Sequence, residues 1–571
     1  MAATAQVAAT RRASRSQLLP LGLIAVGLLA RLAWARSLFL NADEALHYLL
    51  STQPSFLLTY RASLTTVHPP LLILLLHYWS AVGVSEWILR LPSVLAGTAF
   101  CWVMYKWLER TTNEETALIG LSLLAFCPAL IYVSAEIRQY GLLMFFLAAS
   151  LYSLERGIQD DSADWMLLSS FALLLGLSTH YSSLIFAFAM GIYGLLRLVS
   201  RGNRAAVIGV WGAGQMAALG LIAFYVVSHV LPLQRTGFPQ SLADSYLRGS
   251  IFHRGEDRLI PFIFRSNIKV FHYLFSQGVM GVVGLLLFLA GVVTLWRSRN
   301  DQGNSRGPTS RQLAVLLILP LVVNCATAVA GVYPYGGSRH NAYLAGLAMT
   351  GVAVAVARWR QRASWAKPAA LAAGLAICNF TVLPGGVYMK PRNQRITQMQ
   401  QAMGYVDRTL PPGSVIVTDL EGHLALDYYL CHSYVVLHPP FQPFYRMPCG
   451  NYQMIFQDPR QWIFRAPTFP SDMQTLRSMY GMGPETKVWF FQAGFVVDKE
   501  PELRTLLRRY GCANPQEFGA NIFLCEITVG PDPKTYPSDR RYPETDKLKD
   551  LARDAIAWLS RWAVRSDPSA S

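Results

Sequence analysis

The stretch Leu18–Tyr48, LLPLGLIAVGLLARLAWARSLFLNADEALHY, places a long apolar run directly before two carboxylates. The run ends at about Leu40 and is long enough to cross a bilayer, which takes about 20 apolar residues. Asp43 and Glu44 follow it closely, and a charge near hydrocarbon is costly unless it is solvated or paired. We therefore predict a membrane protein in which Asp43 and Glu44 lie at the mouth of the first span and serve catalysis.

The composition of the whole chain indicates the same class of protein. Of its 571 residues, 52% are hydrophobic and only 15% are charged, whereas about 25% of residues are charged in soluble domains. The formal net charge of +16 would fit nucleic-acid binding, but Lys and Arg fall mostly in short clusters between apolar segments. That placement is typical of membrane topology, so we expect the lipid bilayer as a partner and no nucleic acid.

The predicted fold is a polytopic α-helical membrane protein with about eleven transmembrane helices. Arg and Lys gather in alternate short loops, which marks the cytoplasmic side in most membrane proteins, so the N-terminus is predicted to lie inside. The predicted spans are 18–38, 88–108, 116–134, 139–154, 165–179, 182–199, 206–230, 278–296, 312–332, 342–358 and 367–385.

From about Lys390 the composition changes to that of a soluble α/β domain, which the odd number of spans places outside. The elements predicted there are strands at Val415–Asp419, Lys487–Phe491 and Asn521–Ile527 and helices at Asp419–Leu430 and Pro501–Tyr510. The predicted parts of the chain are a cytoplasmic tail (1–17), a transmembrane catalytic domain (18–388), the exterior domain (389–532) and an amphipathic tail (533–571).

Four cysteines lie in the predicted exterior domain: Cys431, Cys449, Cys512 and Cys525. They allow two disulfides, which would need an oxidising compartment, but their spacing fits four free thiols equally well. None of them forms a Cys-x-x-Cys pair of the zinc-binding type.

The predicted exterior loops hold almost every side chain able to do chemistry. Each has a structural alternative: Arg138 could be an interfacial anchor, and His180 a satisfied core histidine. Their convergence on one membrane face favours a site. The first of these loops, 41–87, is also expected to form two interfacial helices, one after Asp43 and one over Leu71–Trp79. The side chains concerned are Asp43, Glu44, His47, His68, Glu136, Arg138, Tyr140, His180, Tyr181, Arg235, Arg339 and His340.

Several motifs in these loops resemble one family, the bacterial protein mannosyltransferase-like glycosyltransferases (family 39) of the GT-C superfamily. The resemblance covers about residues 18–385. Its motifs are Asn41–Tyr48 (NADEALHY), His68–Leu71 (HPPL), His77–Trp79 (HYW), Leu89–Gly97 (LRLPSVLAG), Glu136–Gly141 (EIRQYG) and Gly336–His340 (GGSRH).

The resemblance implies a transferase in a bacterial plasma (inner) membrane, with its site on the periplasmic or exterior face. It would move a sugar from a polyprenyl-phosphate donor to a hydroxyl of a protein, lipid or glycan acceptor. Asp43 corresponds to the family's presumed base, and a carboxylate there can take the proton of the attacking hydroxyl. A single displacement of this kind would invert the anomeric configuration.

The leaving phosphate gains charge and needs fixed positive donors, for which arginine is well suited. We predict that Arg138 and Arg339 bind it, with His340 beside them and Arg235 as a weaker candidate. The residues expected to contact the substrate are His47, His68, Tyr140, His180 and Tyr181.

The chain departs from the related lipid A aminoarabinose transferases at His68-Pro69-Pro70. Those enzymes have a glutamate before Lys-Pro there, so the departure argues against aminoarabinose as the sugar and moves phosphate binding onto the arginines. No cofactor is certain. Glu44 with His68 could bind a divalent metal ion, although members of the resembled family are thought to work without one.

A different class of function, a transporter or flippase of lipid-linked glycans, would also be polytopic and hold charges. Transporters tend to place their sites near the bilayer midplane, between repeated halves. Here the charges lie at one surface and no internal repeat is evident, which favours the enzyme. A third alternative is an assembly partner without activity, for which Asp43→Asn would leave function intact.

Overall fold

The computed structural model describes residues 2–235, 247–275, 278–298, 306–360, 395–431, 442–458, 463–494, 501–519 and 522–530, with side chains from Leu18 onward. The predicted eleventh span, 367–385, and the predicted C-terminal tail lie outside these residues. So does Cys378.

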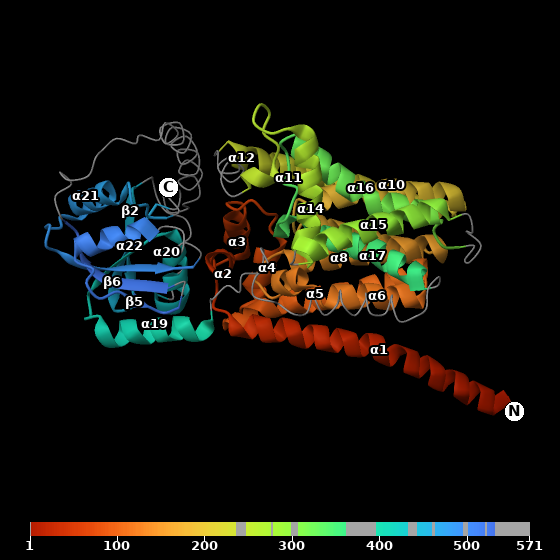
Figure 1. The fold of residues 1–571 in the computed structure, drawn as a ribbon, viewed down its shortest axis with the longest axis horizontal. Coiled ribbons are helices and arrows are strands. Elements are labelled where there is room, and N and C mark those ends of the chain that lie inside the picture. Colours follow the sequence, from red (N-terminus) through yellow and green to blue (C-terminus); the bar gives the residue numbers. More distant parts are fainter. Residues whose placement is uncertain are drawn as a thin grey trace, which may run out of the picture.

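A bundle of helices forms the first and larger part of the molecule (Figure 1). In the part of the chain that is described, eight helices are long and apolar enough to cross a membrane, or nine if a bent pair counts as one span. The protein is therefore a multi-pass membrane protein. The helices of its first half are α1 (Ala2–Ser37), α2 (Ala42–Ser51), α3 (Phe56–Ser63), α4 (Leu71–Trp79), α5 (Glu86–Thr111), α6 (Glu114–Ala125), α7 (Pro128–Ser134), α8 (Tyr140–Gln159), α9 (Ala163–Leu177), α10 (Ser183–Arg201) and α11 (Ala205–Tyr225).

The rest of the bundle continues α11 through a π-helical turn, η1, and then crosses back and forth. Its helices are η1 (Val226–Val230), α12 (Leu231–Gln234), η2 (Arg248–Ser250), α14 (Leu259–Phe275), α15 (Gly278–Arg297), α16 (Ser310–Val329), η3 (Arg339–Leu344) and α17 (Ala345–Arg360). The eight long helices coincide with eight of the predicted spans, so the helical membrane fold is confirmed.

Two predicted spans differ from regular long helices. The segment predicted at 116–134 is the bent pair α6 and α7, which meet at 60°. Pro128 begins α7 and lacks a backbone N–H, so the break falls where proline is best tolerated. The segment predicted at 165–179 is the 15-residue helix α9. The predicted tail 1–17 is helical and continuous with the first span in α1.

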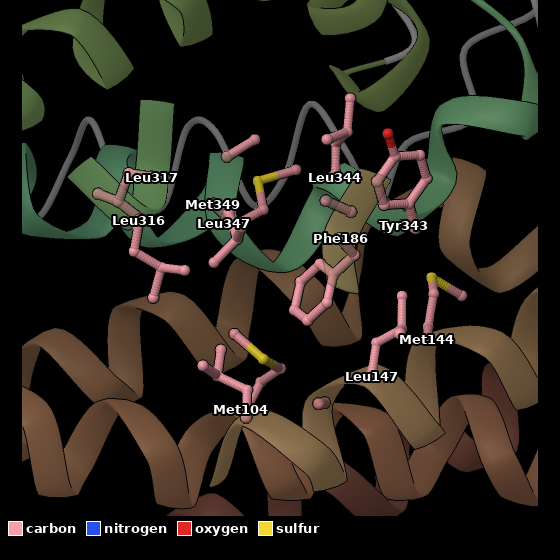
Figure 2. Close-up of a cluster of buried hydrophobic side chains, with 14 of the residues drawn as sticks. Met104, Met144, Leu147, Phe186, Leu316, Leu317, Tyr343, Leu344, Leu347 and Met349 are labelled. Atoms are coloured by element: carbon pink, nitrogen blue, oxygen red, sulfur yellow. The ribbon is translucent and has the colours of Figure 1, made fainter. Parts of the chain in front are cut away.

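Large apolar side chains from separate helices fill the interior of the bundle. Figure 2 shows Met104 of α5, Met144 and Leu147 of α8 and Phe186 of α10 facing η3, α16 and α17. In a bilayer the hydrophobic effect does not drive helices together, so close packing of side chains is what holds the helices at fixed positions. It therefore also fixes the helix ends, where the polar side chains lie.

The C-terminal part of the described chain is an α/β structure around a six-stranded sheet of order β2-β3-β1-β4-β6-β5. Strand β1 is parallel to β3 and β4, and the other pairings are antiparallel. The strands are β1 (Val415–Thr418), β2 (Phe444–Cys449), β3 (Tyr452–Gln457), β4 (Lys487–Ala493), β5 (Gln516–Glu517) and β6 (Ile522–Thr528). The helices are α19 (Ile396–Thr409), α20 (Leu420–Leu426), η4 (Asp427–Cys431), α21 (Phe469–Tyr480), α22 (Pro501–Leu507) and η6 (Arg508–Tyr510).

Alternate residues along the strands face two apolar clusters, one on each side of the sheet. Val417 of β1 packs with Phe469 and Met473 of α21, whereas its neighbour Ile416 packs with Met399 of α19. Two disulfides, Cys431–Cys449 and Cys512–Cys525, join parts of this domain. Of the two states that the cysteine spacing left open, two disulfides or four free thiols, the structure has the disulfides.

Candidate active site

Asp43 lies in the first turn of α2, whose start is fixed by reciprocal hydrogen bonds. The Asn41 side-chain oxygen accepts from the backbone N–H of Glu44 at 3.1 Å, and Glu44 Oε2 accepts from the backbone N–H of Asn41 at 3.1 Å. This capping box satisfies two donors that a helix start would leave without partners. It sets the direction in which Asp43 leaves the helix.

Glu44 forms a buried ion pair with Arg90 of α5. Arg90 Nε lies 2.7 Å from Glu44 Oε1 and Arg90 Nη2 lies 2.8 Å from Oε2, with side-chain exposures of 0% and 1%. Glu44 Oε1 also accepts from the backbone N–H of Ile137 at 2.9 Å. Both carboxylate oxygens of Glu44 therefore accept hydrogen bonds.

Arg90 ties α5 to the residues that precede α2. Its guanidinium donates to the carbonyl oxygens of Ala35 at 2.6 Å, Leu38 at 2.7 Å and Phe39 at 3.0 Å. Arg90 was predicted only as part of the motif Leu89–Gly97, without a role. An arginine inside a predicted span needs a buried partner, and that signal could have paired it with Glu44.

Asp43, by contrast, is the carboxylate that remains accessible, with 34% of its side chain exposed. Its Oδ2 accepts a hydrogen bond from Arg339 Nη2, and Arg138 Nη1 lies 3.4 Å from its Oδ1. Arg339 Nη1 also lies 3.9 Å from Glu136 Oε2, while Glu136 Oε1 accepts from Asn41 Nδ2 at 3.2 Å. Three predicted site residues from distant parts of the chain therefore meet at one point.

The charges around Asp43 determine its protonation. The partial burial of its side chain would raise the pKa of Asp43, but the guanidinium groups of Arg138 and Arg339 outweigh that effect and hold the pKa far below its ordinary value. Asp43 is therefore ionised across the physiological range. It is also a weak base as long as both arginines neutralise it.

A row of imidazole and phenol rings adjoins this ion-pair cluster. The ring centroids of His47 and His68 are 6.2 Å apart, those of His68 and His180 are 5.0 Å apart, and those of His180 and His340 are 6.2 Å apart. The Tyr140 ring lies 5.3 Å from that of His180, and the Arg138 guanidinium lies 5.9 Å from the Tyr140 ring centre. All five rings are buried.

The histidines of this row outside the spans are neutral. Burial, with the nearby charge of Arg138, lowers the pKa of both His47 and His180 to about 3. Burial also holds the pKa of His68 well below its ordinary value. His47 Nδ1 lies 2.6 Å from the Asp43 carbonyl oxygen, so it carries the proton of the neutral ring and donates it there.

Of the described residues, two that were predicted for the site, the substrate candidate Tyr181 and the phosphate candidate Arg235, have no ion pair with Asp43. Tyr181 donates from its hydroxyl to His229 Nδ1 at 2.6 Å, and His229 Nε2 donates to the Thr66 carbonyl oxygen at 2.7 Å. Tyr181 thereby braces the loop before His68. Arg235 is exposed at the end of α12. His229 was not predicted, because it lies within an apolar run.

The possible metal pair, Glu44 with His68, does not form a ligand set in the structure. Glu44 is bound by Arg90 and His68 stacks on His180. Among the described residues, no group of three or more His, Cys, Asp or Glu side chains is arranged to hold a metal ion.

The sequence matches the family model "Dolichyl-phosphate-mannose-protein mannosyltransferase" over residues 67–229. No protein of curated function matches it. The matched segment begins just before His68 and includes Arg90, Arg138, Tyr140, His180 and Tyr181.

Three solved structures match the chain to different extents. ArnT from Cupriavidus metallidurans bound to undecaprenyl phosphate is 13% identical with a TM-score of 0.50, over 90% of this chain and 99% of that one. The Archaeoglobus fulgidus oligosaccharyltransferase tethered to an acceptor peptide is 10% identical with a TM-score of 0.47, over 83% and 69%.

A third match is the Pmt1-Pmt2 protein O-mannosyltransferase complex of S. cerevisiae bound to the sugar donor. It is 21% identical with a TM-score of 0.30 and covers 38% of this chain and 34% of that one. The match thus spans about a third of the yeast chain. The resemblance seen in the motifs is confirmed: this chain has the fold of the GT-C glycosyltransferases and carries the mannosyltransferase family's sequence pattern over residues 67–229.

Proposed function

We propose that this protein is a membrane glycosyltransferase that moves a sugar from a polyprenyl-phosphate donor to an acceptor hydroxyl. The observation that carries the proposal is the accessible Asp43 carboxylate held between Arg138 and Arg339. A base and two phosphate-binding cations at one point are what such a reaction requires. The family description and the undecaprenyl phosphate bound to ArnT support a lipid phosphate donor.

Asp43 is the general base in this proposal. The acceptor oxygen attacks the anomeric carbon, its proton passes to an Asp43 oxygen, and the bond from that carbon to the phosphate oxygen breaks. The electron pair stays on the phosphate, where Arg138 and Arg339 stabilise the charge. Attack opposite to the leaving group inverts the anomeric centre.

Donor binding would activate the base. In the structure both arginines neutralise Asp43 and lower its pKa. A bound phosphate would draw their positive charge toward itself, so the pKa of Asp43 would rise toward its ordinary value. The carboxylate would become a competent base only when the donor is in place.

The remaining residues receive supporting roles. Glu44 positions α2 through Arg90, in place of the catalytic role expected from sequence, and Glu136 orients Arg339. His47, His68, His180, His340 and Tyr140 form a neutral wall beside the reacting groups. Tyr181 supports that wall through His229. Arg235, exposed at the end of α12, has the weakest support as a phosphate ligand.

We place the site on the exterior face of a bacterial plasma membrane. The two disulfides support this orientation, because disulfides persist in oxidising compartments such as the periplasm. The domain that carries them contacts α2, which holds Asp43. The sugar would therefore be transferred to the acceptor on the side of the membrane that faces the oxidising compartment.

The transporter alternative receives less support from the position of the charges. Tyr140 begins α8, Arg339 begins η3 and Asp43 lies in the first turn of α2. The cluster thus gathers at helix ends, whereas transporter sites are usually near the bilayer midplane.

The test is release of polyprenyl phosphate from a panel of polyprenyl-phosphate sugars by purified protein in detergent, with and without a chelator. We expect turnover of one donor by wild-type protein and a loss of roughly a thousandfold or more in Asp43→Asn. Asp160→Asn is the matched control, because Asp160 is also paired with arginines but follows the far end of α8. Equal turnover by Asp43→Asn and wild type would refute the assigned base.

A further inference from the structure

Three residues that lead into α2, Leu38, Phe39 and Leu40, contact the C-terminal domain as well as the membrane bundle. Phe39 is buried in the apolar cluster formed by Met399, Val406 and Ile416 of that domain. Leu38 forms an isolated antiparallel bridge with Arg395. The chain therefore enters the Asp43 helix through the core of a domain that lies hundreds of residues later.

Two adjacent tyrosines of the C-terminal domain, Tyr428 and Tyr429, contact α2 and the segment that leads into it. The backbone N–H of Leu40 donates to the Tyr429 hydroxyl at 2.8 Å. The Tyr428 hydroxyl donates to the Val84 carbonyl oxygen at 2.6 Å, and its ring meets that of Tyr48 edge-on at 5.3 Å. One tyrosine thus holds the start of α2 and the other holds its buried face.

The tyrosines are themselves firmly attached to their domain. They lie in η4, which follows α20, and Leu424 of α20 is buried with Leu40, Ala45 and Leu49. The disulfide Cys431–Cys449 joins the last residue of η4 to β2. Figure 1 shows α2 between the membrane bundle and the domain that contains α20.

From the membrane side, Arg90 binds the Leu38 and Phe39 carbonyl oxygens and the Glu44 carboxylate. The lead-in to α2 is thus held on one side by Arg90 and on the other by Tyr429. We propose that Tyr428 and Tyr429 are positioning residues through which the C-terminal domain sets the Asp43 carboxylate relative to Arg138 and Arg339. This inference rests on the proposed function for its catalytic consequence but not for its structural one.

The structural consequence is tested by hydrogen–deuterium exchange on the full-length protein in detergent. Tyr429→Phe leaves the Leu40 N–H without its acceptor, and Tyr428→Phe removes a donor to Val84. We expect amides within 40–48 to exchange about tenfold faster in the double variant. A buried donor that has lost its acceptor destabilises the folded arrangement, so this segment should open more often. Tyr480→Phe is the matched control, since its hydroxyl donates to the Phe444 carbonyl oxygen inside the domain.

The catalytic consequence is tested with the donor found for wild-type protein. We expect the double variant to lose roughly tenfold in kcat, because small displacements of a reacting group are costly, while KM for the donor stays within about twofold. Unchanged exchange over 40–48, or an equal kcat loss in Tyr480→Phe, would overturn the positioning role. If wild-type protein turned over no donor, the exchange result would still decide the role, and only the proposed function would fall.

Discussion

At the scale of single residues, the two neighbouring carboxylates have different surroundings. Asp43 keeps 34% of its side chain exposed, whereas Glu44 is closed off by Arg90. Adjacent residues of a helix point about 100° apart, so one faces the accessible side while the other faces the interior. The sequence identified the pair, but it could not tell which carboxylate is buried in an ion pair, because the partner of Glu44 lies 46 positions away.

The buried histidines give the protein a predicted pH dependence of stability. In the folded protein the pKa values of His47 and His180 are lowered to about 3 from an ordinary 6.5. Below pH 6.5 the unfolded chain therefore binds protons that the folded chain does not, and stability falls as pH decreases toward 3. The slope is about 1.4 kcal/mol per pH unit for each histidine.

We expect the melting temperature in detergent to fall steadily from pH 6.5 to pH 4.5. The slope should be smaller in a His47→Gln/His180→Gln variant, because that variant lacks the two groups. A melting temperature that is constant over this range in wild-type protein would show that these histidines are not held neutral.

At the scale of elements, the Glu44–Arg90 pair joins α2 to α5. Removing one partner leaves the other as an uncompensated buried charge, so we expect Glu44→Gln to lower the free energy of unfolding by about 3–5 kcal/mol. Lys487→Gln should cost at most about 1 kcal/mol, because its partner Glu526 is at the surface. The comparison is made by denaturant or thermal unfolding, and equal losses would contradict a structural role for Glu44.

The elements that the sequence predicted well are those with strong local signals. Helix α4 spans Leu71–Trp79 as expected, and β1, β4 and β6 lie within one or two residues of their predictions. Strands β2 and β3 and helices α19 and α21 were not predicted. Pro448 within β2 weakens the strand pattern, and it is tolerated because β2 is an edge strand.

At the scale of the whole molecule, the site depends on contacts that no local pattern reveals. The motifs predicted that Asp43, Arg138 and Arg339 share a membrane face, and the structure brings them into contact. The insertion of Phe39 into the C-terminal core could not be predicted, because an apolar residue at the end of a span looks like part of that span. The domain boundaries, the membrane orientation and the roles of the site residues stay predictions.

The central claim is that Asp43 and the donor phosphate share Arg138 and Arg339. The most direct test is the affinity of the purified protein for undecaprenyl phosphate. Because Asp43→Asn removes the anion that competes for the arginines, we predict about tenfold tighter binding together with loss of turnover. Arg339→Gln should weaken binding instead. Unchanged or weaker binding of undecaprenyl phosphate by Asp43→Asn would contradict the shared-arginine account.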